Sequence, residues 1–351
     1  MQPDYSRQIL LKEIGQQGQA KLKQARVLIV GLGGLGSPVM QYLAGAGVGF
    51  LGLVDADVLD ASNLHRQPIY ELADVGKPKA ELARAAIAAI NPAVEVEAFA
   101  ARFNADNALE LIERHDVVVD CSDNFRTKYL INDAAVLAQK PAVFASVYQY
   151  EGQLQVYKPD PRHACLRCLW PDAIADGVVG NCAAAGVLGP VPGAFGSLQA
   201  LLTLKILLQL GAQLEGELLL LDFMNFSSLK IRAPRRAECA APKCAHIQAP
   251  MREDRDIEIA WDIAWDSLAN AAAQGFDVID IRTAEEVAAR PAAARHIPMH
   301  ELLANPELLG VSRPALLVCA TGKRSLAAAQ ALRNRGLMVR SLAGGLQNLE
   351  R

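Results

Sequence analysis

Apolar and polar positions along the chain follow two periods. Short apolar, β-branched runs predict buried strands, and between them apolar residues three and four apart predict helices. The predicted strands are 26–30, 50–55, 94–100, 116–122 and 141–147, and the predicted helices are 37–47, 79–91, 108–115 and 126–139. This strand–helix alternation predicts an α/β fold with a mostly parallel, doubly wound sheet and helices on both faces.

The pattern changes after Tyr148. Segments 152–160 and 217–234 predict antiparallel strands appended to the sheet. Between them lie a Gly/Pro-rich stretch with cysteines and one apolar helix, 197–211. That helix carries Lys205 and is shorter than the roughly 20 apolar residues that span a bilayer. Because no signal-peptide pattern is visible either, we expect a soluble cytoplasmic protein.

A second domain follows a segment without periodicity. Residues 246–256 contain proline and many charges, which is typical of a linker. Strand and helix patterns then alternate again, with strands at 277–282, 315–320 and 339–345 and helices at 265–275, 284–290 and 324–336. We therefore predict a first domain over 1–248, a linker over 249–256 and a small α/β domain over 257–351.

Composition narrows the function classes. The chain has 351 residues and a formal net charge of -3. Without a long basic run, a nucleic-acid-binding surface is not expected. The seven cysteines require another explanation than disulfides in a cytoplasmic protein, and their spacing suggests a metal site and reactive thiols.

A glycine-rich turn follows the first strand. Gly31, Gly33 and Gly36 form G-x-G-x-x-G between an apolar run and a helical one. Gly31 permits the tight turn, Gly33 lets the backbone approach a phosphate, and Gly36 lets the helix pack on the strand. The helix N-terminus favours an anion. NAD and ATP both satisfy this pattern, and the alternative is a packing turn without ligand.

Charged residues farther along favour ATP. Asp55 ends the second predicted strand, where it can accept a ribose hydroxyl. Charged and amide side chains then follow at strand ends and at a helix start, namely Asn63, Arg66, Lys77, Lys79, Asp123 and Asn124. At the carboxyl edge of a parallel sheet they face the ligand crevice. The cations suit a triphosphate, and Asp123 suits Mg²⁺. An enzyme that transfers hydride from a nicotinamide cofactor requires no such group of cations around the ligand.

Six segments carry a family resemblance: "YSRQILL", "RVLIVGLGGLGSP", "SNLHRQ", "VGKPKAE", "DCSDN" and "CLRCLW". Through them the chain resembles, over most of residues 4 to 248, the MoeB/ThiF group of ubiquitin-activating-like adenylyltransferases. The resemblance implies that Mg·ATP adenylates the C-terminal Gly-Gly carboxylate of a small ubiquitin-like protein. It implies a homodimer in which Arg7 reaches the neighbouring subunit's ATP site. The expected nucleotide-binding residues are Gly31, Gly33, Gly34, Gly36, Asp55, Asp57, Asn63, Arg66, Lys79, Asp123 and Asn124.

Two cysteine pairs suggest structural zinc. Cys165 and Cys168 form C-x2-C, and Cys239 and Cys244 form C-x4-C, both within the usual range for a tetrahedral thiolate site. The related family usually has C-x2-C in the second place. The fourth ligand is therefore open between Cys244, His246 and His163, and four reduced cysteines without metal remain the alternative.

Of the other cysteines, Cys121 follows a strand of valines and is expected in the core. Cys182 is a small buried residue or, as in the resembled family, a reactive residue of a mobile loop near the adenylate; Gly180, Gly186 and Gly189 fit such a loop. We assign Cys182 a catalytic role as the thiol that resolves an acyl-disulfide.

Cys319 stands between an apolar strand and a helix expected to begin at Arg324 or Ser325. Backbone N–H groups, Lys323, Arg324 and the helix dipole favour a thiolate or persulfide there. The stretch resembles the C-x-x-G-x-R-S loop of rhodanese-like sulfurtransferases, and "DVIDIRTAEEV" and "LAGGLQNL" match further segments of that family. "ARHIPMHEL" departs from it, because the usual glycine and alanine are missing. A buried strand-end cysteine is the alternative.

Together the domains predict an enzyme that makes an acyl-adenylate and converts it to a thiocarboxylate with sulfur from Cys319. The expected catalytic residues are Arg7, Arg66, Lys79, Asp123, Cys182 and Cys319; the expected cofactors are ATP, Mg²⁺ and Zn²⁺. The expected partners are a Gly-Gly-tailed sulfur carrier, as in molybdopterin or thiamine biosynthesis, and a persulfide-carrying desulfurase or small thiol as sulfur donor. The alternatives are a nicotinamide-dependent oxidoreductase, a non-catalytic nucleotide-binding scaffold, and an enzyme adenylating tRNA or a small carboxylate.

Overall fold

The computed structural model describes residues 3–160, 162–170, 186–236, 239, 244, 247, 249–250, 262–263, 267–273, 275–309, 314–333, 337 and 339–350. Internal contacts divide them into two compact units, one with the described residues from 3 to 250 and one with those from 262 to 350. The predicted linker 249–256 falls mostly outside the described residues, so its boundaries stay a prediction.

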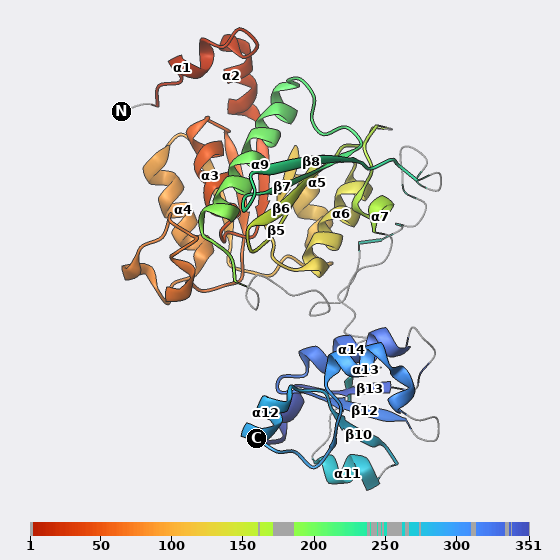
Figure 1. Ribbon diagram of the computed structural model, residues 1–351. Coiled ribbons are helices and arrows are strands. Elements are labelled where there is room, and N and C mark those ends of the chain that lie inside the picture. The colour runs from red at the N-terminus through yellow and green to blue at the C-terminus, as the bar shows by residue number, and fades with distance from the viewer. Residues whose placement is uncertain are drawn as a thin grey trace. The chain divides into compact units, whose positions relative to one another are not determined.

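The first unit is built on an eight-stranded sheet of order β3-β2-β1-β4-β5-β6-β7-β8 (Figure 1). The strands are β1 Arg26–Val30, β2 Phe50–Val54, β3 Glu95–Phe99, β4 Val117–Asp120, β5 Ala142–Tyr148, β6 Glu151–Tyr157, β7 Glu217–Asp222 and β8 Ser227–Arg232. β1 to β5 are parallel, and β6, β7 and β8 are each antiparallel to the strand before them. The predicted parallel sheet with appended antiparallel strands is confirmed.

Helices cover both faces of this sheet, as the strand pattern predicts. The helices are α1 Ser6–Ile9, α2 Gly15–Gln24, α3 Gly36–Gly45, α4 Lys79–Ile90, α5 Ala108–Glu113, α6 Phe125–Ala138, α7 Leu166–Leu169 and α9 Pro190–Leu208, with 3-10 turns η1 Ala61–Asn63 and η2 Leu72–Asp74. Alternate strand residues point to opposite faces. Val27 and Ile29 pack with α3, α4 and α9, whereas Leu28 and Val30 pack with α5 and α6.

The apolar helix α9 lies inside this arrangement. It begins earlier than predicted, at Pro190, and packs against α3 and β5. Over the described residues it is the helix long and apolar enough to cross a membrane, yet 56% of its most apolar window is buried within the protein. Burial in the core explains its composition.

The second unit has a five-stranded parallel sheet of order β11-β10-β12-β13-β9. Its strands are β9 Asp262–Ile263, β10 Asp277–Asp280, β11 Arg295–His296, β12 Ala315–Val318 and β13 Val339–Leu342. Its helices are α11 Leu268–Ala273, α12 Ala284–Ala289, α13 Met299–Ala304 and α14 Lys323–Arg333, with η3 Pro306–Leu309 and η4 Gly345–Glu350. Leu316 and Leu317 of β12 are fully buried and belong to separate apolar clusters, so this sheet too is packed on both faces.

Candidate functional site

The glycine turn joins β1 to α3 and has no room for side chains. Gly31 has φ +92°, and a Cβ on it would lie 2.6 Å from the carbonyl oxygen of Cys121. A Cβ on Gly36 would lie 2.2 Å from the carbonyl oxygen of Gly31. A Cβ on Gly34 would lie 3.1 Å from the Pro192 side chain and 3.2 Å from the carbonyl oxygen of Arg66. The turn therefore lies against both the end of β4 and the segment that follows β2.

Asp55, directly after β2, is bound to this turn. Its carboxylate accepts hydrogen bonds from the backbone N–H of Leu32 at 2.7 Å and of Asp57 at 2.8 Å. Burial raises the pKa of Asp55 above its usual value. Tyr70 donates its hydroxyl hydrogen to the carbonyl oxygen of Leu32 at 2.9 Å. The carboxylate predicted for the ribose is thus held in place, and each of its oxygens retains a free acceptor position.

The predicted phosphate contacts lie on the segment from η1 to α4. Lys79 begins α4 with its side chain buried, and its Nζ binds Asp57 at 3.0 Å. Half-buried Arg66 donates from its guanidinium to the carbonyl oxygen of Ser62 at 3.0 Å. Asn63 accepts from the backbone N–H of Asp60, the N-cap of η1, and completes its capping box. Asp57 and Lys79 therefore form a pair, and Asn63 also has a local structural role.

The segment after β4 supplies the remaining predicted residues, Asp123 and Asn124. Asp123 is exposed and makes no hydrogen bond or ion pair within the part of the chain that the structure describes. Asn124 caps α6 by accepting from the Thr127 N–H at 2.8 Å. The structure thus brings the glycine turn, Asp55 and the end of β4 to one edge of the sheet. Arg7, on α1, is exposed, and its role in a partner's site stays a prediction.

A buried ion pair that the sequence did not reveal lies beneath this edge. Asp120, the last residue of β4, binds Lys128 of α6, and neither side chain is appreciably exposed. Lys128 also donates to the carbonyl oxygen of Ala145 at 2.7 Å, and Ser122 donates to Asp120 at 2.6 Å. The signal in the sequence was a carboxylate ending a run of valines, since a buried charge requires a partner.

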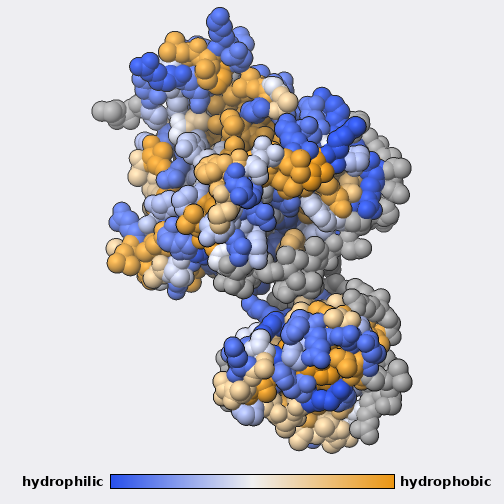
Figure 2. Space-filling model, viewed as in Figure 1, coloured by the Kyte–Doolittle hydropathy of each residue, from blue (hydrophilic) through white to orange (hydrophobic). Residues whose placement is uncertain are grey.

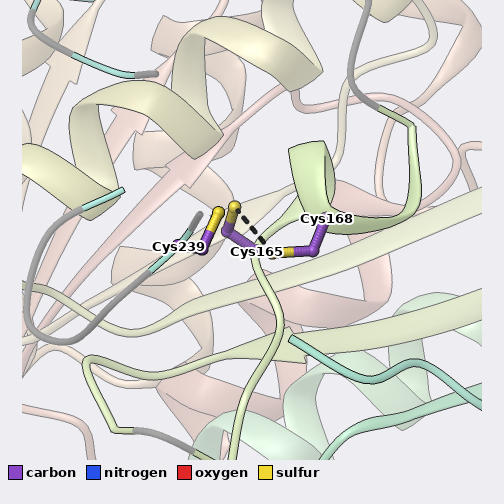
Figure 3. Close-up of side chains that lie close together, drawn as sticks. All are labelled: Cys165, Cys168 and Cys239. Carbon is purple, nitrogen blue, oxygen red and sulfur yellow. Dashed lines mark hydrogen bonds between the residues drawn. The ribbon is translucent and has the colours of Figure 1, made fainter. Parts of the chain in front are cut away.

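Three of the four predicted zinc ligands lie close together among the described residues (Figure 3). The sulfur atoms of Cys165, Cys168 and Cys239 lie within 4.8 Å of one another, and the Sγ of Cys244 is 2.9 Å from that of Cys239. A hydrogen bond from Cys165 lowers the pKa of Cys168 to about 5, and the pKa of Cys165 rises. This arrangement can hold a thiophilic cation.

Two histidines, His163 and His246, were the predicted alternatives to Cys244 as the fourth zinc ligand. His163 is buried, and its Nδ1 lies 3.6 Å from a carboxylate oxygen of Asp160. It is not part of the group of close sulfur atoms found among the described residues. His246 lies outside the described residues. Cys244 is not part of that group either, although its Sγ lies close to that of Cys239, so the identity of the fourth ligand stays a prediction.

Two other cysteine predictions meet different outcomes. Cys121 is buried in the core as expected, and burial raises the pKa of its thiol well above the usual value. Cys182 and Gly180 lie outside the described residues, so the catalytic role of Cys182 stays a prediction. The expectation that Gly189 belongs to a mobile loop is wrong, because Gly189 is the N-cap of α9 and a Cβ on it would lie 2.1 Å from the carbonyl oxygen of His65.

The Cys319 loop joins β12 to α14 in the second unit. The helix begins at Lys323, one residue before the predicted start. The thiol of Cys319 is fully buried, and its sulfur accepts from the backbone N–H of Ser325 at 3.4 Å. The loop packs closely against Gly345, where a side chain would not fit, because a Cβ on Gly345 would lie 2.3 Å from the Gly322 nitrogen. A backbone donor does face the sulfur, as expected.

The arginine beside this cysteine is already paired. Arg324 donates to both carboxylate oxygens of Glu286, at 2.9 and 2.5 Å, and this lowers the pKa of Glu286 to about 2. Asp280 and Arg282 form a second, buried pair. The D-x-R-x-x-x-E segment thus connects to the cysteine loop through Glu286, a role that sequence analysis did not assign.

Comparisons with known proteins agree with this geometry. The ThiF family model matches residues 5–242 and the rhodanese-like domain model matches residues 264–351. The chain belongs to the ThiF family and carries a rhodanese-like domain in its C-terminal part.

Two curated relatives cover different shares of the chain. The sulfur carrier protein adenylyltransferase of Thermus thermophilus is 48% identical over 72% of this chain and 94% of its own length. The adenylyltransferase and sulfurtransferase MOCS3 of Anopheles gambiae is 40% identical over 97% of this chain and 85% of its own.

Among solved structures, E. coli MccB with ATP has the same fold, with a TM-score of 0.57 and 24% identity over 64% of this chain and 67% of its own. PaaA is 26% identical with a TM-score of 0.56, over 65% of this chain and 72% of its own.

Proposed function

We propose that this chain adenylates the C-terminal Gly-Gly carboxylate of a ubiquitin-like sulfur carrier and transfers sulfur to it from Cys319. The observation that carries the proposal is the presence, in one chain, of the nucleotide turn with its surrounding charges and of the cysteine loop. The relative that matches across both parts is named for both activities. An oxidoreductase or a tRNA-adenylating enzyme leaves the second unit without a use.

The first step is displacement at phosphorus. A carrier carboxylate oxygen attacks the α-phosphorus of ATP, the bond to the pyrophosphate breaks, and an acyl-adenylate and pyrophosphate form. Two anions must approach each other, so the residues contribute mainly position and positive charge. Arg66, Lys79 and the N-terminus of α3 supply that charge, and Asp55 orients the ribose.

The second step is acyl transfer to sulfur. The outer sulfur of a Cys319 persulfide attacks the acyl carbon, AMP leaves, and an acyl-disulfide remains. A thiolate, which we assign to Cys182, attacks the Cys319 sulfur, releases the thiocarboxylate and leaves a disulfide for an external thiol to reduce. Because Cys319 is buried with its sulfur against Ser325, the loop has to open to load and discharge sulfur. The sulfur donor is a persulfide-carrying protein or a small thiol.

Two metals belong to this proposal. Exposed Asp123, at the carboxyl end of β4, has the oxygen ligands that Mg²⁺ prefers, and the ion would neutralise phosphate charge. Cys165, Cys168, Cys239 and Cys244 would hold Zn²⁺ as a structural ion, since four thiolates leave no open position for chemistry. Cys239→Ser should abolish bound zinc and lower the thermal midpoint, as measured by metal analysis and calorimetry; unchanged zinc content contradicts the site.

A homodimer completes the proposal. The α1 segment carries Arg7 beside exposed Leu10 and Leu11, 71% and 54% exposed, and apolar residues are seen among polar ones there in Figure 2. We expect this segment to pack against a second copy and to place Arg7 in its ATP site.

Pyrophosphate exchange tests the adenylation step. The full chain with Mg·ATP and a Gly-Gly-tailed carrier should exchange labelled pyrophosphate into ATP, and a carrier without its last two glycines should not support exchange. Exchange that is independent of the carrier, or absent with every Gly-Gly-tailed carrier, contradicts the proposal.

A further inference from the structure

Two buried hydroxyl groups form a chain that ends at the sulfur of Cys319. Ser325 of α14 and Ser341 of β13 are both fully buried, and the Ser341 Oγ donates to the Ser325 Oγ at 3.0 Å. The Ser325 Oγ lies 3.4 Å from the Cys319 Sγ. Ser341 therefore reaches the reactive sulfur through one intermediate hydroxyl, from a strand outside the cysteine loop.

Ser341 occupies a position of β13 whose neighbours are apolar. β13 pairs with β12, and Ser341 lies opposite Leu317 (Figure 1). Val339, two residues earlier on the same face of the strand, belongs with Leu317 and Cys319 to one apolar cluster. A hydroxyl in such surroundings costs free energy unless it is hydrogen-bonded. The bond to Ser325 offsets that cost and links β13 to the cysteine loop.

The hydroxyl of Ser325 has one hydrogen and two acceptor positions. It donates to the carbonyl oxygen of Gly322 at 3.0 Å, so a Cys319 thiol would donate its own hydrogen to the Ser325 Oγ. Once Cys319 has lost its proton, its sulfur can only accept. The Ser325 hydroxyl then has to turn from Gly322 to the sulfur, where the Ser325 backbone N–H already donates. Ser341 can donate to the Ser325 Oγ in both arrangements.

We propose that Ser341 is a positioning residue, which holds the Ser325 hydroxyl as a donor to Cys319 when that sulfur is anionic and carries no extra sulfur. This inference rests on the proposed function, because this anion is the form of Cys319 that attacks a sulfur donor. The thiolate attacks the outer sulfur of a donor persulfide, the S–S bond breaks, the donor leaves as a thiolate, and a Cys319 persulfide remains. A hydroxyl that accepts one hydrogen bond donates the next one more strongly.

Alkylation of Cys319 by iodoacetamide at neutral pH, followed by mass spectrometry of the Cys319 peptide, tests the inference on the full chain. The thiolate attacks the carbon of the reagent and iodide leaves, so neither ATP nor a sulfur donor is needed. For Ser341→Ala we expect roughly 3- to 10-fold slower alkylation. In Ser325→Ala, which lacks the intermediate hydroxyl, adding Ser341→Ala should change the rate by less than about twofold.

Val339→Ala is the matched control for loosened packing. It removes buried atoms from the same strand and the same apolar cluster but leaves both hydroxyl groups in place. Because local opening would expose Cys319 more often, alkylation of this variant should be unchanged or faster. If the role of Ser341 were purely structural, Ser341→Ala would behave in the same way, whereas the positioning role requires slower alkylation.

Sulfur loading at a low concentration of a persulfide donor should slow in Ser341→Ala by about the same factor, with carrier-dependent pyrophosphate exchange unchanged. Alkylation of Ser341→Ala at the wild-type rate or faster overturns the inference. Equal slowing in the Ser325→Ala background, or sulfur loading at the wild-type rate, overturns it as well. Thiocarboxylate formation that does not depend on Cys319 contradicts the proposed function but leaves the alkylation rates unaffected, which separates the two failures.

Discussion

The glycine turn after β1 and the cysteine loop after β12 are both strand–loop–helix connections at the carboxyl edge of a parallel sheet, yet they are completed differently. Around the turn, the ends of β1, β2 and β4 and the start of α4 each contribute groups. The cysteine loop supplies its own sulfur, backbone donor and arginine, and one residue from outside, Glu286, pairs with that arginine.

The difference follows from the chemistry. A polyanion needs charge on several sides, which separate segments must supply, whereas a sulfur nucleophile needs one well-placed atom and a few donors. The first site is therefore vulnerable to the loss of any one of several distant residues, and the second mainly to changes within its loop.

Removing one cation from the first site should have the largest effect on the adenylation step. Lys79→Met removes a buried ammonium group that lies 3.0 Å from Asp57, and we expect adenylation to fall on the order of 10²–10³-fold. Sulfur transfer from Cys319 to a small thiol acceptor should not change. The control is Lys77→Met. Lys77 was also among the cations predicted near the nucleotide, but it is exposed and, among the described residues, its ammonium group pairs with Asp74. Equal losses of adenylation in the two variants would contradict the assignment.

Adding one methyl group should change the stability in opposite directions at the glycine turn and at the far end of the helix that follows it. Gly36→Ala places a Cβ 2.2 Å from the carbonyl oxygen of Gly31. A Cβ on Gly45, at the other end of α3, would meet no atom within 4 Å beyond its own helix backbone and chain neighbours. We expect Gly36→Ala to lower the free energy of unfolding by about 1–3 kcal/mol and to weaken ATP binding.

Gly45→Ala should raise that free energy by up to about 1 kcal/mol, because alanine is the better helix former. Urea unfolding measures both changes. Equal effects at the two glycines would show that the turn is not tightly packed.

The smallest effect is expected from the arginine pair of the cysteine loop. The pKa of Glu286 is lowered from 4.5 to about 2 in the folded protein. The stabilisation is therefore complete above about pH 4.5 and is lost as the pH falls towards 2. Both side chains are more than a third exposed, so we expect Glu286→Gln to cost under about 1 kcal/mol at pH 7 and less at pH 4. Unfolding at both pH values checks this, and a cost that grows on acidification would contradict it.

The same contrast explains what could be predicted from the sequence. Periodicity was enough for β1 to β5 and their helices, because those runs are long and apolar. It could not reveal the two-residue strands β9 and β11 or the short helix α13, which are defined by pairing and packing. The cysteine loop was predictable from one continuous segment, whereas the contacts of Asp120 with Lys128 and of Glu286 with Arg324 join distant positions.

The central claim is that the two units carry out separate steps on one carrier, and Cys319→Ala tests it most directly. The variant and the wild type would each be given Mg·ATP, a Gly-Gly-tailed carrier and a persulfide donor that requires a sulfurtransferase. We predict carrier-dependent pyrophosphate exchange at the wild-type rate, with thiocarboxylate formation reduced on the order of 10³-fold or more. Thiocarboxylate formed by Cys319→Ala at the wild-type rate would contradict the account.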